Sequence, residues 1–269
     1  MGVLNVTPDS FSDGGLYFDH DRALTAALAM IDDGADIVDV GGESTRPGAR
    51  DVDEAEERRR VVPLVAKLAP HASVPISVDT TKAGVARAAL DAGATIVNDI
   101  SGLRQDAALG DVAARAGAAL ILMHMRGTPH DMYARAVYRS VPEEVAAELR
   151  WSLAAAVARG VSREAVILDP GIGFAKRAEH SWQILSHLDH PALLTLDRPW
   201  LVGPSRKSFL EQATGECPSA TREWATAAAV TTAVLLGAHI VRVHSVREMT
   251  AVVRAADLVR RCREQAKQV

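Results

Sequence analysis

Short apolar runs alternate with helical patterns along the whole chain. The runs cover residues 2–6, 36–40, 75–78, 95–97, 119–123, 165–168, 200–202 and 239–243. They are rich in Val, Ile and Leu, which is typical of strands buried on both faces of a parallel sheet. Between them, apolar residues recur at helical spacing, as in residues 21–33 and 246–265. The pattern therefore predicts eight strands, each followed by a helix.

Eight strand–helix units favour a closed (β/α)8 barrel, the TIM barrel, over an open doubly wound α/β sheet. The length of 269 residues suits such a barrel. An open dinucleotide-binding sheet would carry G-x-G-x-x-G after its first strand, and the only partial match, residues 171–173, comes late in the chain. Because no shift in composition divides the chain, we expect a single barrel domain over residues 1–269.

Composition and charge narrow the class of protein. Hydrophobic residues make up 48% and charged residues 24%, and the formal charge of −4 argues against general binding to nucleic acid or membrane surfaces. The most apolar helical stretch, residues 225–238, is too short to span a bilayer, which needs ~20 residues. The first residues do not resemble a signal peptide, and two isolated cysteines, Cys217 and Cys262, fit a reducing compartment. We therefore expect a cytoplasmic protein.

Polar residues follow nearly every predicted strand. In a (β/α)8 barrel the loops after the strands share one face, and that face holds the active site. We expect one pocket there, built from Asn5, Thr45, Arg46, Asp79, Asn98, Asp169, Ser205, Lys207, Arg242 and His244.

Three of these residues suit an amide-like heterocycle. Asp79, Asn98 and Asp169 stand at strand ends, where a carboxylate can accept two parallel N–H bonds and an amide can both donate and accept. Two other interpretations stay open. Asp79 and Asn98 could cap the helices that follow them, and the Asp-Pro-Gly sequence at 169–171 could be an ordinary turn.

A second group suits phosphate. Thr45, Arg46, Arg242 and His244 offer cations and hydrogen-bond donors, and arginine binds phosphate bidentately. Asn5 could support a hydrated Mg2+, which keeps most of its waters and uses phosphate oxygens as ligands. Arg46 could instead be a solvated loop charge.

The Ser-Arg-Lys-Ser sequence at 205–208 precedes a predicted helix, whose first N–H groups could bind an anion. Lys207 could hold a ring carbonyl, or act as a Schiff-base nucleophile if its pKa were lowered. Serine-hydrolase chemistry is not supported, because the G-x-S-x-G motif is missing. His124 and His130 lack a convincing set of partners for zinc.

Seven motifs, in order, resemble the dihydropteroate synthase family of folate biosynthesis. They are LNVTPDSFSDGG at 4–15, GGESTRPG at 41–48, SVDT at 77–80, NDI at 98–100, DPGIGFAK at 169–176, SRKSF at 205–209 and RVH at 242–244. The resemblance covers nearly the whole chain. It implies a (β/α)8 barrel that joins 7,8-dihydropterin-6-ylmethyl diphosphate to 4-aminobenzoate, giving 7,8-dihydropteroate and diphosphate.

The same resemblance implies a role for each candidate residue. Asp79, Asn98, Asp169 and Lys207 would hold the pterin; Thr45, Arg46, Arg242 and His244, with Mg2+ near Asn5, would hold the diphosphate; and Pro47, Phe174 and Ser208 would bracket the aminobenzoate. Asp13 and Arg46 would lie on loops that close over the site, and Asp13, Thr45, Arg46 and Lys207 would be catalytic. Homodimers formed through the late helices are common in the family.

Three alternative functions are compatible with parts of the same sequence. A pterin-binding methyltransferase would share the barrel and the Asp/Asn/Asp pocket, but would not need residues 7–11 or the Ser-Arg-Lys motif. A Schiff-base aldolase would use Lys207, and a non-catalytic paralogue would bind pterin without turnover.

Overall fold

Eight parallel strands form the centre of the molecule. We describe residues 1–7, 19–45, 51–215 and 219–266 of a computed structural model. The strands are β1 (Gly2–Asn5), β2 (Val38–Gly41), β3 (Ile76–Asp79), β4 (Ile96–Asp99), β5 (Ala119–Met123), β6 (Val166–Asp169), β7 (Leu201–Val202) and β8 (Ile240–Val241). β1 to β6 are hydrogen-bonded in sequence order, and β7 pairs with β8.

Two single bridges join these groups into a closed ring. Gly2 pairs with Val243 beyond β8, and Leu168 in β6 pairs with Trp200 just before β7. The bond from Val3 N to the carbonyl oxygen of Val243 is 3.0 Å long. The predicted (β/α)8 barrel is therefore confirmed, although β7 and β8 are shorter than their apolar runs indicated.

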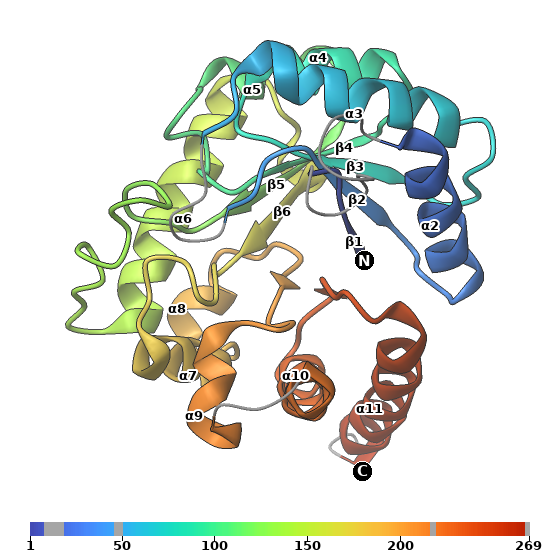
Figure 1. Cartoon of the computed structure of the whole chain (residues 1–269). Helices are drawn as coiled ribbons and strands as arrows, with labels where there is room; N and C mark the ends of the chain where they lie inside the picture. The colour runs from blue at the N-terminus through green and yellow to red at the C-terminus, as the bar shows by residue number, and fades with distance from the viewer. Residues whose placement is uncertain (8–18, 46–50, 216–218, 267–269) are drawn as a thin grey trace.

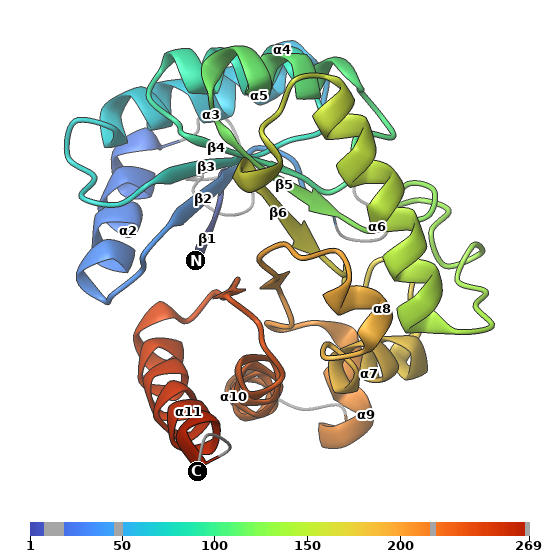
Figure 2. The ribbon, with the colours of Figure 1, turned by 180° about the vertical axis from the view of Figure 1, so that it is seen from behind.

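The helices surround this ring. They are α2 (His20–Asp32), α3 (Glu54–Leu68), α4 (Ala83–Asp91), α5 (Ala108–Ala116), α6 (Val141–Ala158), α7 (Ala178–Ser186), α8 (Pro191–Leu194), α9 (Glu211–Thr214), α10 (Ser219–Leu235) and α11 (Val246–Ala266), with 3-10 turns at η1 (Arg163–Ala165) and η2 (Ser208–Leu210). α2 to α6 cover the outer side of β1 to β6, and α7 to α11 lie on the opposite side of the molecule (Figures 1 and 2). In the described part of the chain, we find no helix with the length and apolar character needed to cross a membrane.

The barrel interior changes from apolar to polar along the strands. One buried cluster combines Met1, Ile96, Ile121 and Leu201, with Ile37, Ala119, Ile167 and Ile240 packed against it. Because residues two apart on a strand point to the same side, the next positions on that side are polar on four strands. These positions are Asp39, Asn98, Asp169 and Arg242. The carboxyl-terminal end of the barrel thus collects polar groups above an apolar plug.

Candidate active site

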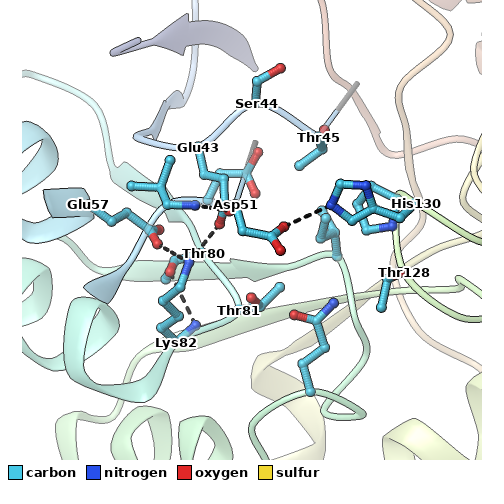
Figure 3. A pocket seen from close by; sticks show the side chains of 15 residues that line it. Glu43, Ser44, Thr45, Asp51, Glu57, Thr80, Thr81, Lys82, Thr128 and His130 are labelled. Carbon is cyan, nitrogen blue, oxygen red and sulfur yellow. Dashed lines mark hydrogen bonds and ion pairs between the residues drawn. The ribbon is translucent and has the colours of Figure 1, made fainter. Parts of the chain in front are cut away.

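A small cavity of about 50 Å3 lies at this polar end of the barrel. Its lining consists of Val3, Thr45, Asp79, Asn98, Ile100, Met123, Asp169, Phe174, Gly203, Ser205, Lys207, Arg242 and His244. A second cavity, of about 300 Å3, shares Thr45, Asp79 and Ile100 with it (Figure 3). The structure thus brings together most of the residues that follow the predicted strands.

Arg242 is the centre of the polar network in the small cavity. Its Nε donates to Oδ2 of Asp39 at 2.7 Å, and its Nη2 donates to Oδ2 of Asp79 at 2.8 Å. Asn98 Nδ2 donates to the same Asp39 oxygen at 3.0 Å. One guanidinium therefore links β2 and the end of β3 to the segment after β8. An arginine has five N–H donors, so others remain for an anion.

Asp39 is a functional candidate that the sequence reasoning missed. Its side chain is fully buried and serves both Arg242 and Asn98. The signal was a carboxylate between two valines in a buried strand, where a charge is costly unless it is paired. The sequence does not indicate that the partner follows the last strand.

The helix-capping interpretation of Asp79 and Asn98 is wrong. α4 and α5 have Lys82 and Ala107 at their N-cap positions. Asp79 and Asn98 are instead adjacent in the register of β3 and β4, and both line the cavity. Their side chains are therefore available to a ligand.

The turn interpretation of residues 169–171 is correct for one oxygen of Asp169. Its Oδ1 accepts a bond of 2.7 Å from Gly171 N, while the residue also lines the cavity. Gly171 and Gly173 both have positive φ. A Cβ on Gly171 would lie 2.0 Å from the carbonyl oxygen of His124, and one on Gly173 would lie 2.9 Å from Lys207 Cδ. The loop can therefore approach the pocket this closely only with glycine at these positions.

Lys176 supports the same loop from behind, and sequence reasoning gave it no role. It is almost completely buried, and its ammonium donates to the carbonyl oxygens of Gly171 at 3.1 Å and Phe174 at 3.2 Å. Nζ also lies 2.8 Å from Nδ1 of His124. Burial lowers the pKa of Lys176 to about 7. Its contacts fix the backbone on both sides of Ile172 and so help to place the Phe174 ring.

Lys207 lies next to Phe174 and within the electrostatic influence of Asp169. It donates to the carbonyl oxygen of Ile172, and Nζ is 4.3 Å from the centre of the Phe174 ring. Burial lowers the pKa of Lys207 to about 8, while the charge of Asp169 opposes that shift. The ammonium is thus a donor at the edge of the pocket, next to an aromatic face.

Of the remaining predicted site residues, Ser205 and His244 line the small cavity, whereas Ser208 does not. His244 Nδ1 lies 3.0 Å from Ser205 Oγ, and both residues line the cavity. Ser208 is exposed and is not among the residues that line either cavity. It opens η2, which leads into the single turn of α9, so the expected anion site at a helix N-terminus has only a short helix behind it.

Asn5 ends β1 and is half-buried. Its register partner is Gly41, which in turn pairs with Asp79, so Asn5 stands two strands away from Asp79 at the same level of the barrel. Asp13, Arg46 and Pro47 lie outside the described residues. Thr45, which precedes them, lines both cavities.

The protonation of Asp79 provides a test of this geometry. Burial raises the pKa of Asp79 to about 7; Arg242 opposes the shift, whereas Asp39, Glu57 and Asp99 add to it. The native state therefore holds a proton that the unfolded state releases at lower pH. Stability from this group is present at low pH and is lost as the pH rises through about 7.

Asp79→Asn resembles the protonated form of Asp79. We expect its stability relative to wild type to rise by about 2 kcal/mol between about pH 5 and pH 8, measured by urea unfolding; a constant difference would contradict the assignment.

Fold and pocket together define a class of protein. A closed (β/α)8 barrel with charged and amide side chains at the carboxyl ends of its strands is the architecture of a barrel enzyme. The model of the family described as "Pterin binding enzyme" matches residues 1–244. The chain belongs to this family and, within it, to the dihydropteroate synthases.

Curated relatives and solved structures agree with that placement. Dihydropteroate synthase of Mycobacterium leprae is 48% identical over 92% of this chain and 88% of its own length. The folic acid synthesis protein fol1 of Schizosaccharomyces pombe is 46% identical over 97% of this chain, which spans 36% of that longer protein. A crystal structure of the Yersinia pestis dihydropteroate synthase with a sulfonamide drug superimposes with a TM-score of 0.89 at 40% identity, covering 96% of this chain and 93% of that one.

Proposed function

We propose that the pocket condenses 7,8-dihydropterin-6-ylmethyl diphosphate with 4-aminobenzoate, giving 7,8-dihydropteroate and diphosphate. The observation that carries this proposal is the grouping of Asp79, Asn98 and Asp169 around Arg242 at the polar end of the barrel. A solved dihydropteroate synthase of Xanthomonas albilineans binds 7,8-dihydropteroate, and one of Thermus thermophilus binds 4-aminobenzoate. In our proposal, residues 1–269 form one pterin-binding barrel domain.

The pterin end of the substrate would enter the small cavity. Its ring carries adjacent N–H donors, which match the carboxylates of Asp79 and Asp169. Asn98 can present its amide oxygen to a donor or its amide hydrogens to a ring nitrogen. Lys207 would donate to the ring carbonyl, from its position beside Asp169 and over Phe174.

The diphosphate would lie at the rim of the pocket. Arg242 and His244 come from the segment after β8, and Thr45 from the segment after β2, so donors approach from two sides. Arg46 would join them. The leaving group departs as an anion, and fixed cations that stabilise its charge lower the barrier.

Mg2+ belongs to the same proposal, and Asn5 is its expected protein ligand. Among the described residues we find no group of three or more His, Cys, Asp or Glu side chains that could form a metal cage. One amide oxygen at a strand end fits Mg2+, which keeps several waters and is usually bound by few protein ligands together with phosphate oxygens. When bound, the ion would neutralise diphosphate charge.

In this proposal, Phe174, Pro47 and Ser208 would bracket the aminobenzoate. The ring of Phe174 offers a face for the aromatic acid. Because Ser208 is exposed at the start of η2, it would contact the carboxylate end, which needs solvent or donors.

The proposed reaction is a dissociative, SN1-like substitution. The C–O bond to diphosphate breaks first, and diphosphate takes the electron pair. The resulting pterin methylene cation is stabilised by the acidic groups of the pocket and by Asp13. The aniline nitrogen then attacks the methylene carbon and releases its extra proton to water, so no covalent enzyme intermediate forms. A borohydride-trapped adduct on Lys207 would refute this mechanism and favour the Schiff-base alternative.

Diphosphate release tests the proposed function. We expect release from the pterin diphosphate in the presence of Mg2+ to depend on 4-aminobenzoate, with 7,8-dihydropteroate as the product. Release without aminobenzoate would indicate a hydrolase. Tight pterin binding without any release would indicate a methyltransferase-like or non-catalytic protein.

Binding of the two substrates is expected to be ordered. The diphosphate would bind to donors on the segments after β2 and β8. One of these donors, Thr45, lines the same cavity as Phe174, the proposed aminobenzoate contact. We therefore expect calorimetry to give an at least ~10-fold weaker Kd for 4-aminobenzoate without diphosphate than with it, about 1.4 kcal/mol. Equal affinities would refute the ordered scheme.

We also propose a homodimer in the cytoplasm. The apolar residues Ala229, Val230, Ala233 and Val234 of α10 are buried in the core, so they do not support an interface. Support comes from exposed apolar side chains on the last two helices, namely Trp224 on α10 and Leu258 and Val259 on α11. Sedimentation would test the dimer.

A further inference from the structure

The carboxylate of Glu43 connects the two described ends of the segment between β2 and α3. Glu43 lies two residues after β2, and its Oε1 accepts a bond of 2.8 Å from the backbone N–H of Val52. Its other oxygen, Oε2, accepts a bond of 2.6 Å from Lys82 Nζ. Glu43 thus connects the two ends of the segment that contains Thr45 and holds both against the start of α4 (Figure 3).

Lys82 joins this carboxylate to a second one. Its Nζ is also 2.6 Å from Oε2 of Glu57, a residue of α3 whose side chain is fully buried. The side chains of Lys82 and Glu43 are only 25% and 22% exposed. Burial opposes the charge of Lys82, but the two glutamates outweigh it and raise the pKa of the ammonium. Without that ammonium, two poorly solvated carboxylates would face each other and repel.

The backbone before Glu43 is held separately. A Cβ on Gly42 would lie 2.8 Å from Val61 Cγ2 and 3.0 Å from Glu57 Cγ, so the end of β2 packs closely on α3. Arg60 Nη1 donates to the carbonyl oxygen of Gly42 at 2.9 Å. These contacts fix the chain as far as residue 42. From residue 43 to 52, the described contacts with the frame include Lys82 on Glu43 and the exposed pair of Asp51 and His130, whose Oδ1 and Nε2 lie 3.0 Å apart.

We propose that Lys82 is a positioning residue of the synthase, which places Glu43 and through it Thr45 at the diphosphate end of the pocket. The inference rests on the proposed function. Lys82 and Glu43 line the larger cavity, and Thr45 and Asp79 are shared with the smaller one, so the tie lies beside the reacting end of the substrate. The bonds of Asp79, Asn98 and Asp169 described above run instead through Arg242, Asp39 and Gly171. Replacing Lys82 should therefore impair the positioning of the diphosphate and leave the binding of the pterin ring unchanged.

Lys82→Met tests the proposal, because its effect on the diphosphate end of the substrate can be measured separately from its effect on the pterin end. We expect kcat/KM for the pterin diphosphate to fall about 10²-fold, the size of effect that a displacement of about 1 Å at a reacting group can produce. The Kd of 6-hydroxymethyl-7,8-dihydropterin, which lacks the diphosphate, should stay within about twofold of wild type. Lys67→Met is the matched control, because Lys67 forms an exposed pair with Asp21 at 2.5 Å, at the end of α3 away from Glu57. It should behave as wild type.

Two more variants show whether Lys82 acts through Glu43. Lys82→Arg retains the charge and a fork for two carboxylates, and should recover most of the activity. Glu43→Gln combined with Lys82→Met should lose little more than Lys82→Met alone, because residues that act as one unit are not additive. If Lys82→Met does not fold, Glu43→Gln alone carries the test and should lower kcat/KM without changing pterin affinity.

Some outcomes would overturn the inference. Unchanged kcat/KM in Lys82→Met or Glu43→Gln would show that the ion pair of Lys82 and Glu43 does not contribute to the reaction. An equal loss of affinity for the pterin without diphosphate would show general damage to the pocket. If the wild-type protein itself does not form dihydropteroate, the proposed function fails, and that result is distinct from a failure of the Lys82 variants.

Discussion

Arg242→Met is expected to lower the free energy of unfolding by about 3–5 kcal/mol, because it leaves the fully buried carboxylate of Asp39 without its counter-charge and removes the hydrogen-bond partner of Asp79. Activity should fall further than stability alone explains, by about 10²–10³-fold in kcat, since the same guanidinium would also stabilise the leaving diphosphate. Urea unfolding and steady-state kinetics at neutral pH measure the two effects separately.

The pH dependence and a control make this prediction specific. The stability deficit of Arg242→Met should shrink as the pH falls, because the carboxyl of Asp79 needs no counter-charge once it is protonated. Arg242→Lys should recover only part of both losses, since an ammonium lacks the guanidinium fork that serves Asp39 and Asp79 together. Arg247 is exposed, and its Nε lies 3.4 Å from Oδ1 of Asp33. Arg247→Met should therefore change neither the free energy of unfolding nor kcat. A stable Arg242→Met with a pH-independent deficit would contradict the role we assign to the pair.

Asp169→Asn is expected to reduce kcat/KM for the pterin diphosphate by about 10²-fold while the protein stays folded. The asparagine oxygen can still accept the bond from Gly171 N, so the turn after β6 is preserved. Its amide hydrogens, however, would face the ring N–H donors that the carboxylate is proposed to accept. Losing a charged hydrogen bond and leaving a buried donor unpaired costs about 3 kcal/mol, which corresponds to about 10²-fold.

Pterin binding measured by calorimetry distinguishes this effect from a loss of fold. The affinity for 6-hydroxymethyl-7,8-dihydropterin should fall together with kcat/KM in Asp169→Asn, whereas in Lys82→Met it should not. Asp111→Asn is a suitable control, because Asp111 is partly exposed on α5, away from both cavities, and pairs with Arg159 at 2.7 Å. If Asp169→Asn bound the pterin as well as wild type, the ring would have to be held by other groups.

Much of this architecture could be predicted from the chain alone. The spacing of apolar residues indicated eight strand–helix units, because a strand buried on both faces and an amphipathic helix leave different periodicities in the sequence. Once the strands are parallel and closed into a barrel, their carboxyl ends must share one face. The positions of Asp79, Asn98 and Asp169 at predicted strand ends are therefore enough to place the three side chains together.

The sequence alone left the partners of the buried charges undetermined. Asp39 and Arg242 form an ion pair although they are 203 positions apart in the sequence. Local sequence patterns likewise do not predict that Lys82 pairs with Glu43, or that Lys176 binds the loop that carries Phe174. Nothing near Asp39 in the chain predicts which cation will neutralise it. Ser208 lines neither cavity, so its contact with the aminobenzoate carboxylate stays a prediction.

The sequence by itself therefore determined the order and kind of the elements, and the end of the barrel at which polar groups gather, because these follow from periodicity and from the direction of parallel strands. Only the tertiary structure decided how the ring closes at the short strands β7 and β8, and which charges compensate one another inside it. The physical reason is that burial makes an unpaired charge costly, and the pairing that removes this cost depends on distances that exist only after the barrel has closed.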